Sequence, residues 1–130
     1  MVIDSSALIA ILFREPDAAL YETALAGARL RLMSAVIRVE LSLVVEGRKG
    51  DAGRVILDQF LAAGDFEIVS VTAHHASLAI EAFRRFGKGR HQAGLNIGDC
   101  FSYALAAATG FSLLFKGNDF SHTDIPNALR

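Results

Sequence analysis

The feature that most constrains the fold is the alternation of short apolar runs with longer segments of helical periodicity. The expected strands cover 2–4, 30–33, 67–71 and 112–115, and the expected helices cover 5–15, 16–28, 35–49, 52–63, 73–86 and 99–110. One more short strand is expected near Ile125. Strands interleaved with helices predict right-handed βαβ units, and therefore an α/β fold of three layers, α/β/α, with a mainly parallel central sheet.

Length and composition narrow the class of protein. A chain of 130 residues, 52% of them hydrophobic, predicts one domain over 1–130 with a sizeable core. The net charge of −1 argues against a highly basic nucleic-acid binder but allows a local basic patch. Cys100 is the only cysteine, which favours a reducing, cytoplasmic location, and no apolar run reaches the roughly 18 residues of a membrane span.

Asp4 is the carboxylate whose position most needs an explanation. In "MVIDSSALIAIL" three apolar residues precede it, and a second apolar run follows it after two serines. An ionised group in such surroundings is costly to desolvate without a partner, a cation or water. Asp4 ends the first expected strand and Asp119 follows the last one, so both are expected at the carboxyl edge of the sheet, where open α/β folds bind ligands.

Two further acids are candidates for the same site. The residues three and four positions from Glu40 are all apolar, which predicts that Glu40 points inward and, about 9 Å into its helix, reaches back towards the strand ends. Asp99 follows Gly98 at the start of an apolar helix.

Each acid, taken alone, also has a structural explanation. Asp4 and Asp99 could cap helices, and Asp119 lies in the turn-forming sequence "GND". Glu40 could pair with an arginine. Taken together, however, four carboxylates at one edge would repel one another unless a divalent cation neutralised them, and oxygen-only ligands favour Mg²⁺.

Four segments, in this order, resemble the PIN-domain ribonucleases, in particular the VapC toxins of bacterial type II toxin-antitoxin operons. They are "VIDSSALIAIL", "SAVIRVEL", "LNIGDCFSYALAAATG" and "LLFKGNDFSHTDI", and the resemblance covers essentially the whole chain. It implies a PIN-like fold and an endoribonuclease that uses Mg²⁺ or Mn²⁺ and leaves a 5′-phosphate. The catalytic and metal-binding acids carry over to Asp4, Glu40, Asp99 and Asp119.

One departure from the resembled pattern concerns the last segment. Many relatives carry an acid two positions before the final aspartate, where this chain has Gly117. Because Gly117 cannot bind a metal ion through its side chain, the resemblance assigns Asp119 as the fourth ligand. Ser6 and Asn118 are expected to support the acids as neighbouring polar groups.

The basic segment "RRFGKGRH" precedes Asp99 and offers charge for an RNA backbone. Lys88 and Arg90 in the expected loop, together with Arg85, are candidate phosphate contacts. For Arg85 the alternative is a favourable cation near a helix C-terminus. Aromatic residues do not interleave with these cations, which favours recognition of a folded RNA, and the resemblance implies transfer RNA or another structured RNA.

The expected partners follow from apolar surface and from the resemblance. The segments "ALIAILF" and "AALYETALAGARL" contain more apolar residues than a small core needs. The resemblance implies a homodimer and a groove for a cognate VapB-type antitoxin, a basic or amphipathic partner that blocks the acidic site.

Two other functions stay open at this point. A catalytically silent PIN-like binding module would keep the fold and lose an acid. A Mg²⁺-binding receiver domain would need paired acids after the first strand, an acceptor aspartate after the third and a lysine after the fifth. Lys116 corresponds only weakly to that lysine.

Overall fold

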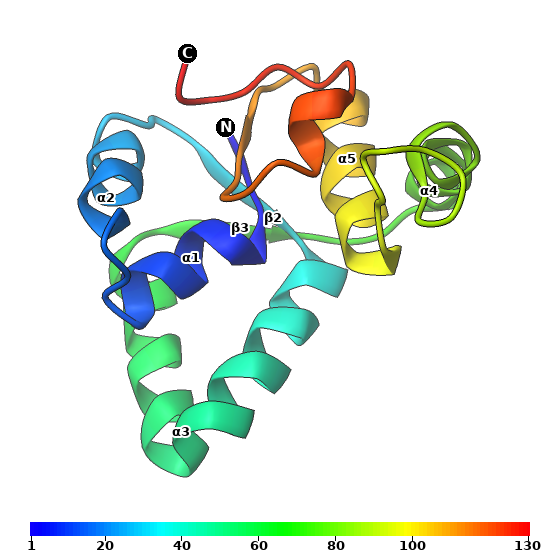
Figure 1. The fold of residues 1–130 in the computed structure, drawn as a ribbon. Helices are drawn as coiled ribbons and strands as arrows, with labels where there is room; N and C mark the ends of the chain where they lie inside the picture. The colour runs from blue at the N-terminus through cyan, green and yellow to red at the C-terminus, as the bar shows by residue number, and fades with distance from the viewer.

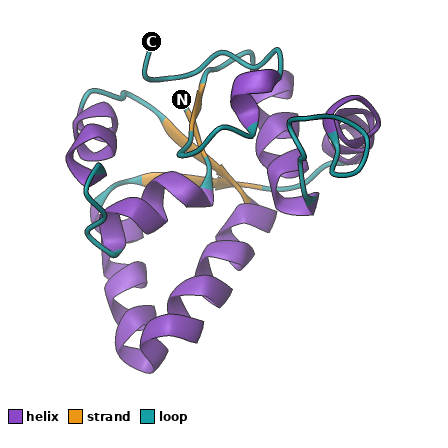
Figure 2. Ribbon diagram, in the orientation of Figure 1, coloured by secondary structure: helices purple, strands orange, loops and turns teal.

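A four-stranded, all-parallel sheet forms the centre of the protein in this computed structural model, which describes residues 1–130 (Figures 1 and 2). Its strands are β1 (Val2–Ile3), β2 (Arg31–Ser34), β3 (Phe66–Val69) and β4 (Leu113–Leu114). They lie in the order β3-β2-β1-β4, so the first strand pairs with both β2 and β4. The predicted α/β class with a parallel sheet is confirmed. The expected tail strand is a single bridge, between Leu113 and Asn127.

Five α-helices and one short 3₁₀ helix surround the sheet. They are α1 (Ser5–Leu12), α2 (Ala18–Ala26), α3 (Ala35–Ala63), α4 (Ala73–Phe86), α5 (Ile97–Thr109) and η1 (Phe120–His122). The two helices expected over 35–63 are the two arms of α3, which form a V in Figure 1. The break is at Gly50, whose φ of 61° and ψ of −150° lie in a region that glycine adopts without strain.

Two hydrophobic cores lie on opposite faces of the sheet. Successive strand residues point to opposite faces, so Val2 packs with α4 and α5 while Ile3 packs with α1, α2 and α3. The same division holds for Leu113 and Leu114 on β4. The expected three-layer α/β/α arrangement is therefore present, and the carboxyl ends of β1 and β4 lie between the two helical layers.

Exposed apolar side chains lie mainly away from the first two helices. Most of α1 is buried, whereas Leu43 on the first arm of α3 and Ile97 at the start of α5 are 67% and 76% exposed. Helical periodicity places Ala79, Ile80 and Phe86 on one apolar stripe of α4 and predicts that the whole stripe is buried, which is partly wrong. Ala79 and Phe86 are buried as expected, but Ile80 is exposed because the inward face of the helix is centred on residue 82. No helix is both long and apolar enough to cross a membrane.

Candidate active site

Asp4 is a buried carboxylate held by three hydrogen bonds from neutral donors. Its Oδ2 accepts the backbone N–H of Ser6 at 3.1 Å, which caps α1, and the Ser6 hydroxyl at 2.6 Å. Its Oδ1 accepts the Ser102 hydroxyl at 2.6 Å from the middle of α5. The Ser6 oxygen in turn accepts the backbone N–H of Lys116, just after β4. The predicted support from Ser6 is thus present, and it links the ends of β1 and β4.

Glu40 lies half-buried on the first arm of α3 and turns its carboxylate towards the start of α5. Its Oε1 accepts the hydroxyl of buried Ser5 at 2.6 Å. Its Oε2 lies against Gly98, where a Cβ atom would overlap it. Only part of the expected apolar setting is present, because Ile37 is buried beside Glu40 whereas Leu43 is exposed.

Asp99 caps the first turn of α5 and also belongs to the acidic cluster. Its carboxylate accepts the backbone N–H of Asn96 at 3.0 Å, and Asn96 Oδ1 accepts the backbone N–H of Asp99 at 2.9 Å. Burial raises the pKa of Asp99 to about 7; the N–H of Asn96 opposes this, and the charges of Asp4, Asp119 and Glu40 add to it. The other three predicted acids therefore all lie within electrostatic reach of Asp99.

Asp119 is exposed at the start of η1 and forms no side-chain cap. Gly117 precedes it with a φ of 98°, a conformation that would strain any residue with a side chain, including the acid expected in relatives.

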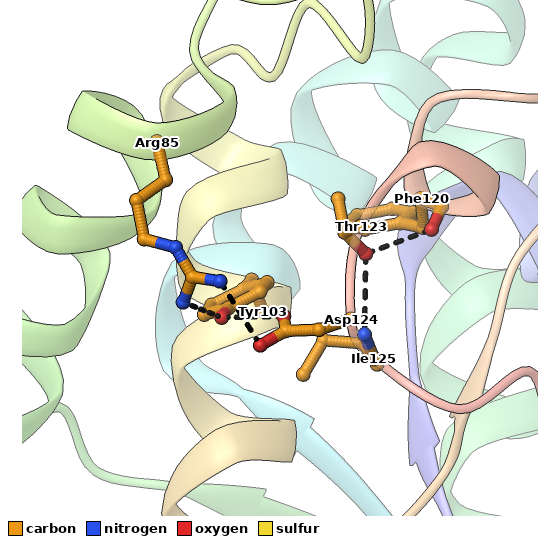
Figure 3. Close-up of polar contacts among 6 residues, drawn as sticks. All are labelled: Arg85, Tyr103, Phe120, Thr123, Asp124 and Ile125. Atoms are coloured by element: carbon orange, nitrogen blue, oxygen red, sulfur yellow. Dashed lines mark hydrogen bonds and ion pairs between the residues drawn. The ribbon is translucent and has the colours of Figure 1, made fainter.

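A polar cluster fastens the segment that carries Asp119 to α4 and α5 (Figure 3). The Tyr103 hydroxyl donates to Asp124 at 2.7 Å, and Arg85 lies 3.3 Å from both groups. The acceptor Asp124 contributes, after burial, to raising the pKa of Tyr103 to about 12. Arg85, predicted to contact RNA, therefore has an intramolecular anionic partner.

None of the four acids forms an ion pair. The cation that follows β4, Lys116, binds Glu15 at 2.6 Å and Asp17 at 2.8 Å instead. No three His, Cys, Asp or Glu side chains are close enough to hold a metal ion between them in this structure. The donor set nevertheless suits a hard cation: the ligands are carboxylate oxygens, their protein partners are neutral, and ionising Asp99 is opposed by its neighbours.

The other predicted contacts lie at the surface. Asn118 is exposed, and its side chain has no hydrogen bond to the acids. Lys88 is exposed and has no ion-pair partner. The guanidinium of Arg90 lies 5.4 Å from the centre of the Phe83 ring.

Four supporting residues were not identified from the sequence: Ser5, Asn96, Gly98 and Ser102. The spacing of Asn96 and Asp99 is that of a capping box and could have been recognised. Ser5 and Ser102 give no such signal, because their roles depend on contacts across the fold.

The PIN domain family profile matches residues 1–126. The chain belongs to the PIN-domain family. Its sequence is 52% identical to Ribonuclease VapC30 of Mycobacterium tuberculosis over 125 residues, 96% of this chain and 95% of that protein. It is 45% identical to Ribonuclease VapC28 of the same organism, over 99% of this chain and 98% of that protein. This PIN-domain chain is therefore a member of the VapC ribonuclease family.

Solved PIN-domain structures share the fold. The structure of M. tuberculosis VapC20, described as a sarcin-ricin loop cleaving toxin, aligns with a TM-score of 0.78 over 95% of each chain, at 17% identity. A toxin-antitoxin complex from Klebsiella pneumoniae aligns with a TM-score of 0.69, over 95% of this chain and 92% of that one, also at 17% identity. The strand order here also differs from the 2-1-3-4-5 order of receiver domains, so the receiver hypothesis loses its support.

Proposed function

We propose that this VapC-family chain is a divalent-metal-dependent endoribonuclease, the toxin of a toxin-antitoxin pair. The observation that carries the proposal is the gathering of four acids, on four separate segments, without a single cationic side chain among them. A purely structural acid is normally paired with a cation when it is buried. Here Lys116, whose backbone N–H supports the cluster through Ser6, binds other carboxylates with its ammonium group, so the site retains negative charge for a ligand.

Asp4, Glu40, Asp99 and Asp119 would hold the ion, with Mg²⁺ the expected cofactor and Mn²⁺ a substitute. When bound, such an ion supplies positive charge and lowers the pKa of water for attack on a phosphodiester. The protein's own groups set the geometry. Ser6 and Ser102 fix both oxygens of Asp4, Ser5 fixes one oxygen of Glu40, and Asn96 fixes one oxygen of Asp99.

The proposed substrate is a structured RNA, with transfer RNA as the first candidate. Lys88 and Arg90 lie exposed on the loop that leads into α5, where phosphate groups of a folded RNA can approach them. Arg85 is a weaker candidate because its charge already pairs with Asp124. Action on RNA and the unpaired Cys100 both fit a cytoplasmic location.

The direct test is cleavage of total RNA by purified, antitoxin-free protein, with sequencing of the new 5′ ends. Discrete cuts that require Mg²⁺ and disappear with EDTA or with Asp4→Asn are expected, and the sequenced ends would identify the RNA. If wild type, the EDTA sample and Asp4→Asn all leave RNA intact, the nuclease proposal fails and the silent binding module replaces it.

We also propose a homodimer formed through the exposed apolar side chains around the acidic site. Val39 and Leu43 on α3 and Ile97 on α5 line one groove with Glu40 at its edge, and this groove contains no other charged residue. Burying it against a second copy would remove these side chains from water. Light scattering should give a dimer for wild type and a monomer for Leu43→Lys.

A separate groove is the proposed site of a VapB-type antitoxin. It lies between the end of α1 and the V of α3, has a volume of about 380 Å³, and is lined by Phe13, Val45 and Ile56 with Arg14 and Lys49 at its rim. An amphipathic helix fits such a surface, since its apolar face can enter the groove while its polar face meets the rim. Co-purification with a co-expressed VapB-type antitoxin that binds the wild-type protein should be lost with Ile56→Asp.

A further inference from the structure

Gly98 is the one glycine of the chain that faces an acid. A methyl group at this position would overlap Oε2 of Glu40 and would lie 2.9 Å from Cδ and 3.3 Å from Oε1. The three nearest atoms all belong to Glu40, so backbone packing is not what excludes a side chain here. The missing Cβ creates a space that the glutamate carboxylate fills.

Backbone conformation gives no other reason for glycine at this position. Gly98 lies in the first turn of α5 and is absent from the residues with positive φ. Alanine has a higher helix propensity than glycine, so an alanine there would ordinarily stabilise the helix. Glycine at position 98, directly before Asp99, therefore makes the helix less stable than alanine would.

Two contacts thus fix the position of the Glu40 carboxylate. The hydroxyl of buried Ser5 holds Oε1 at 2.6 Å, and the surface of Gly98 receives Oε2. A side chain at residue 98 would therefore occupy the position that Oε2 of Glu40 takes, directly before Asp99 in the chain.

We propose that Gly98 is a positioning residue that lets Glu40 reach the metal-binding cluster beside Asp99. The inference rests on the proposed function, whose ligand set includes both acids. It goes further by assigning a specific role to a residue that bears no ligand atom. Any side chain at position 98 would push the Glu40 carboxylate away from Asp99 and weaken metal binding.

The test compares Mn²⁺ affinity by calorimetry and thermal unfolding in EDTA for five proteins: wild type, Gly98→Ala, Gly47→Ala, Glu40→Ala and the Glu40→Ala/Gly98→Ala double variant. Gly47 is the matched control, since it is a helical glycine with nothing within 4 Å of the added methyl. Loss of a group that orients a ligand typically weakens metal binding about 10- to 100-fold. We expect that loss for Gly98→Ala and wild-type affinity for Gly47→Ala.

The Glu40→Ala background separates this role from a general effect on folding. There, adding Gly98→Ala should leave Mn²⁺ affinity unchanged and raise the melting temperature, because the clashing carboxylate is gone. Wild-type affinity for Gly98→Ala, or an equal loss in both backgrounds, would overturn the inference. If wild type itself neither binds Mn²⁺ nor cleaves RNA, the proposed function fails. The Glu40-dependent change in melting temperature in EDTA would still show whether Gly98 positions the carboxylate.

Discussion

Replacing Asp99 with asparagine is expected to stabilise the metal-free protein at neutral and alkaline pH while it abolishes metal-dependent cleavage. Burial, opposed by the N–H of Asn96 and reinforced by the charges of Asp4, Asp119 and Glu40, raises the pKa of Asp99 from 3.8 to about 7. Asparagine has almost the same shape, keeps an oxygen that can accept the N–H of Asn96, and does not ionise. It therefore removes the repulsion and retains the helix cap.

The sign and size of the effect follow from proton binding. Between pH 3.8 and about 7 the folded state binds more protons at Asp99 than the unfolded state, so the free energy of unfolding falls as the pH rises through this range and is constant above it. A shift of about 3 units corresponds to at most about 4 kcal/mol. Losing the negative charge at the start of α5 costs about 0.3–1 kcal/mol, so a net gain of about 3 kcal/mol is expected at pH 8.

Urea unfolding in EDTA at pH 5 and pH 8, followed by circular dichroism, measures this difference. The free energy of unfolding of Asp99→Asn should be clearly higher than that of wild type at pH 8. The difference between the two proteins should be much smaller at pH 5. Glu22→Gln is the control, because Glu22 is exposed and forms no ion pair, and it should follow wild type at both values. Parallel pH profiles for wild type and Asp99→Asn would refute the reasoning, since they would mean that Asp99 ionises freely in the folded protein. Adding Mg²⁺ at pH 8 should stabilise wild type and not the variant.

Three other substitutions test the supports of the site. Ser102→Ala removes a buried hydrogen bond to the side chain of Asp4 and should lower the free energy of unfolding by about 1–3 kcal/mol in urea. Tyr103→Phe removes the bond to Asp124, should lower stability by about 1 kcal/mol, and should slow RNA cleavage because the segment bearing the fourth acid loses its anchor. Lys116→Met leaves two acids unpaired and should lower the melting temperature without changing the Mn²⁺ affinity measured by calorimetry.

Local signals in the sequence predicted the elements well where a cap or a glycine marked their ends. Ser34 accepts the N–H of Val36 at the start of α3, and Gly64 ends that helix, which are the positions that serine and glycine typically take at helix ends. The sequence did not predict which face of α4 is buried, because Ile80 and Ala82 lie on nearly opposite sides of the helix and only the packing against α5 determines that the side of Ala82 faces inward. Propensity and periodicity describe an element alone, whereas burial depends on its neighbour.

The acidic cluster shows the same division between local and distant information. Asp4, Glu40 and Asp119 could be selected from strand ends and helix periodicity, and Asp99 from the resemblance to the PIN-domain ribonucleases. The hydrogen-bond partners of these acids could not be predicted from the sequence. Neighbouring serines divide between two acids, Ser5 to Glu40 and Ser6 to Asp4, and which hydroxyl reaches which acid depends on how α1 meets α3.

A structural role for each acid does not compete with a functional one. Asp4 caps α1 and Asp99 caps α5, as the structural explanations require, yet both remain without a cation. Capping uses one oxygen of Asp99 and ties the acid rigidly to a helix, which fixes the direction of the carboxylate before any ligand arrives. What separates this site from ordinary helix caps is the position of Lys116. Its backbone supports the cluster through Ser6 while its charged group turns away to other carboxylates. A lysine placed inward would permanently offset part of the negative charge of the four acids, whereas this arrangement leaves that charge available for an exchangeable ion.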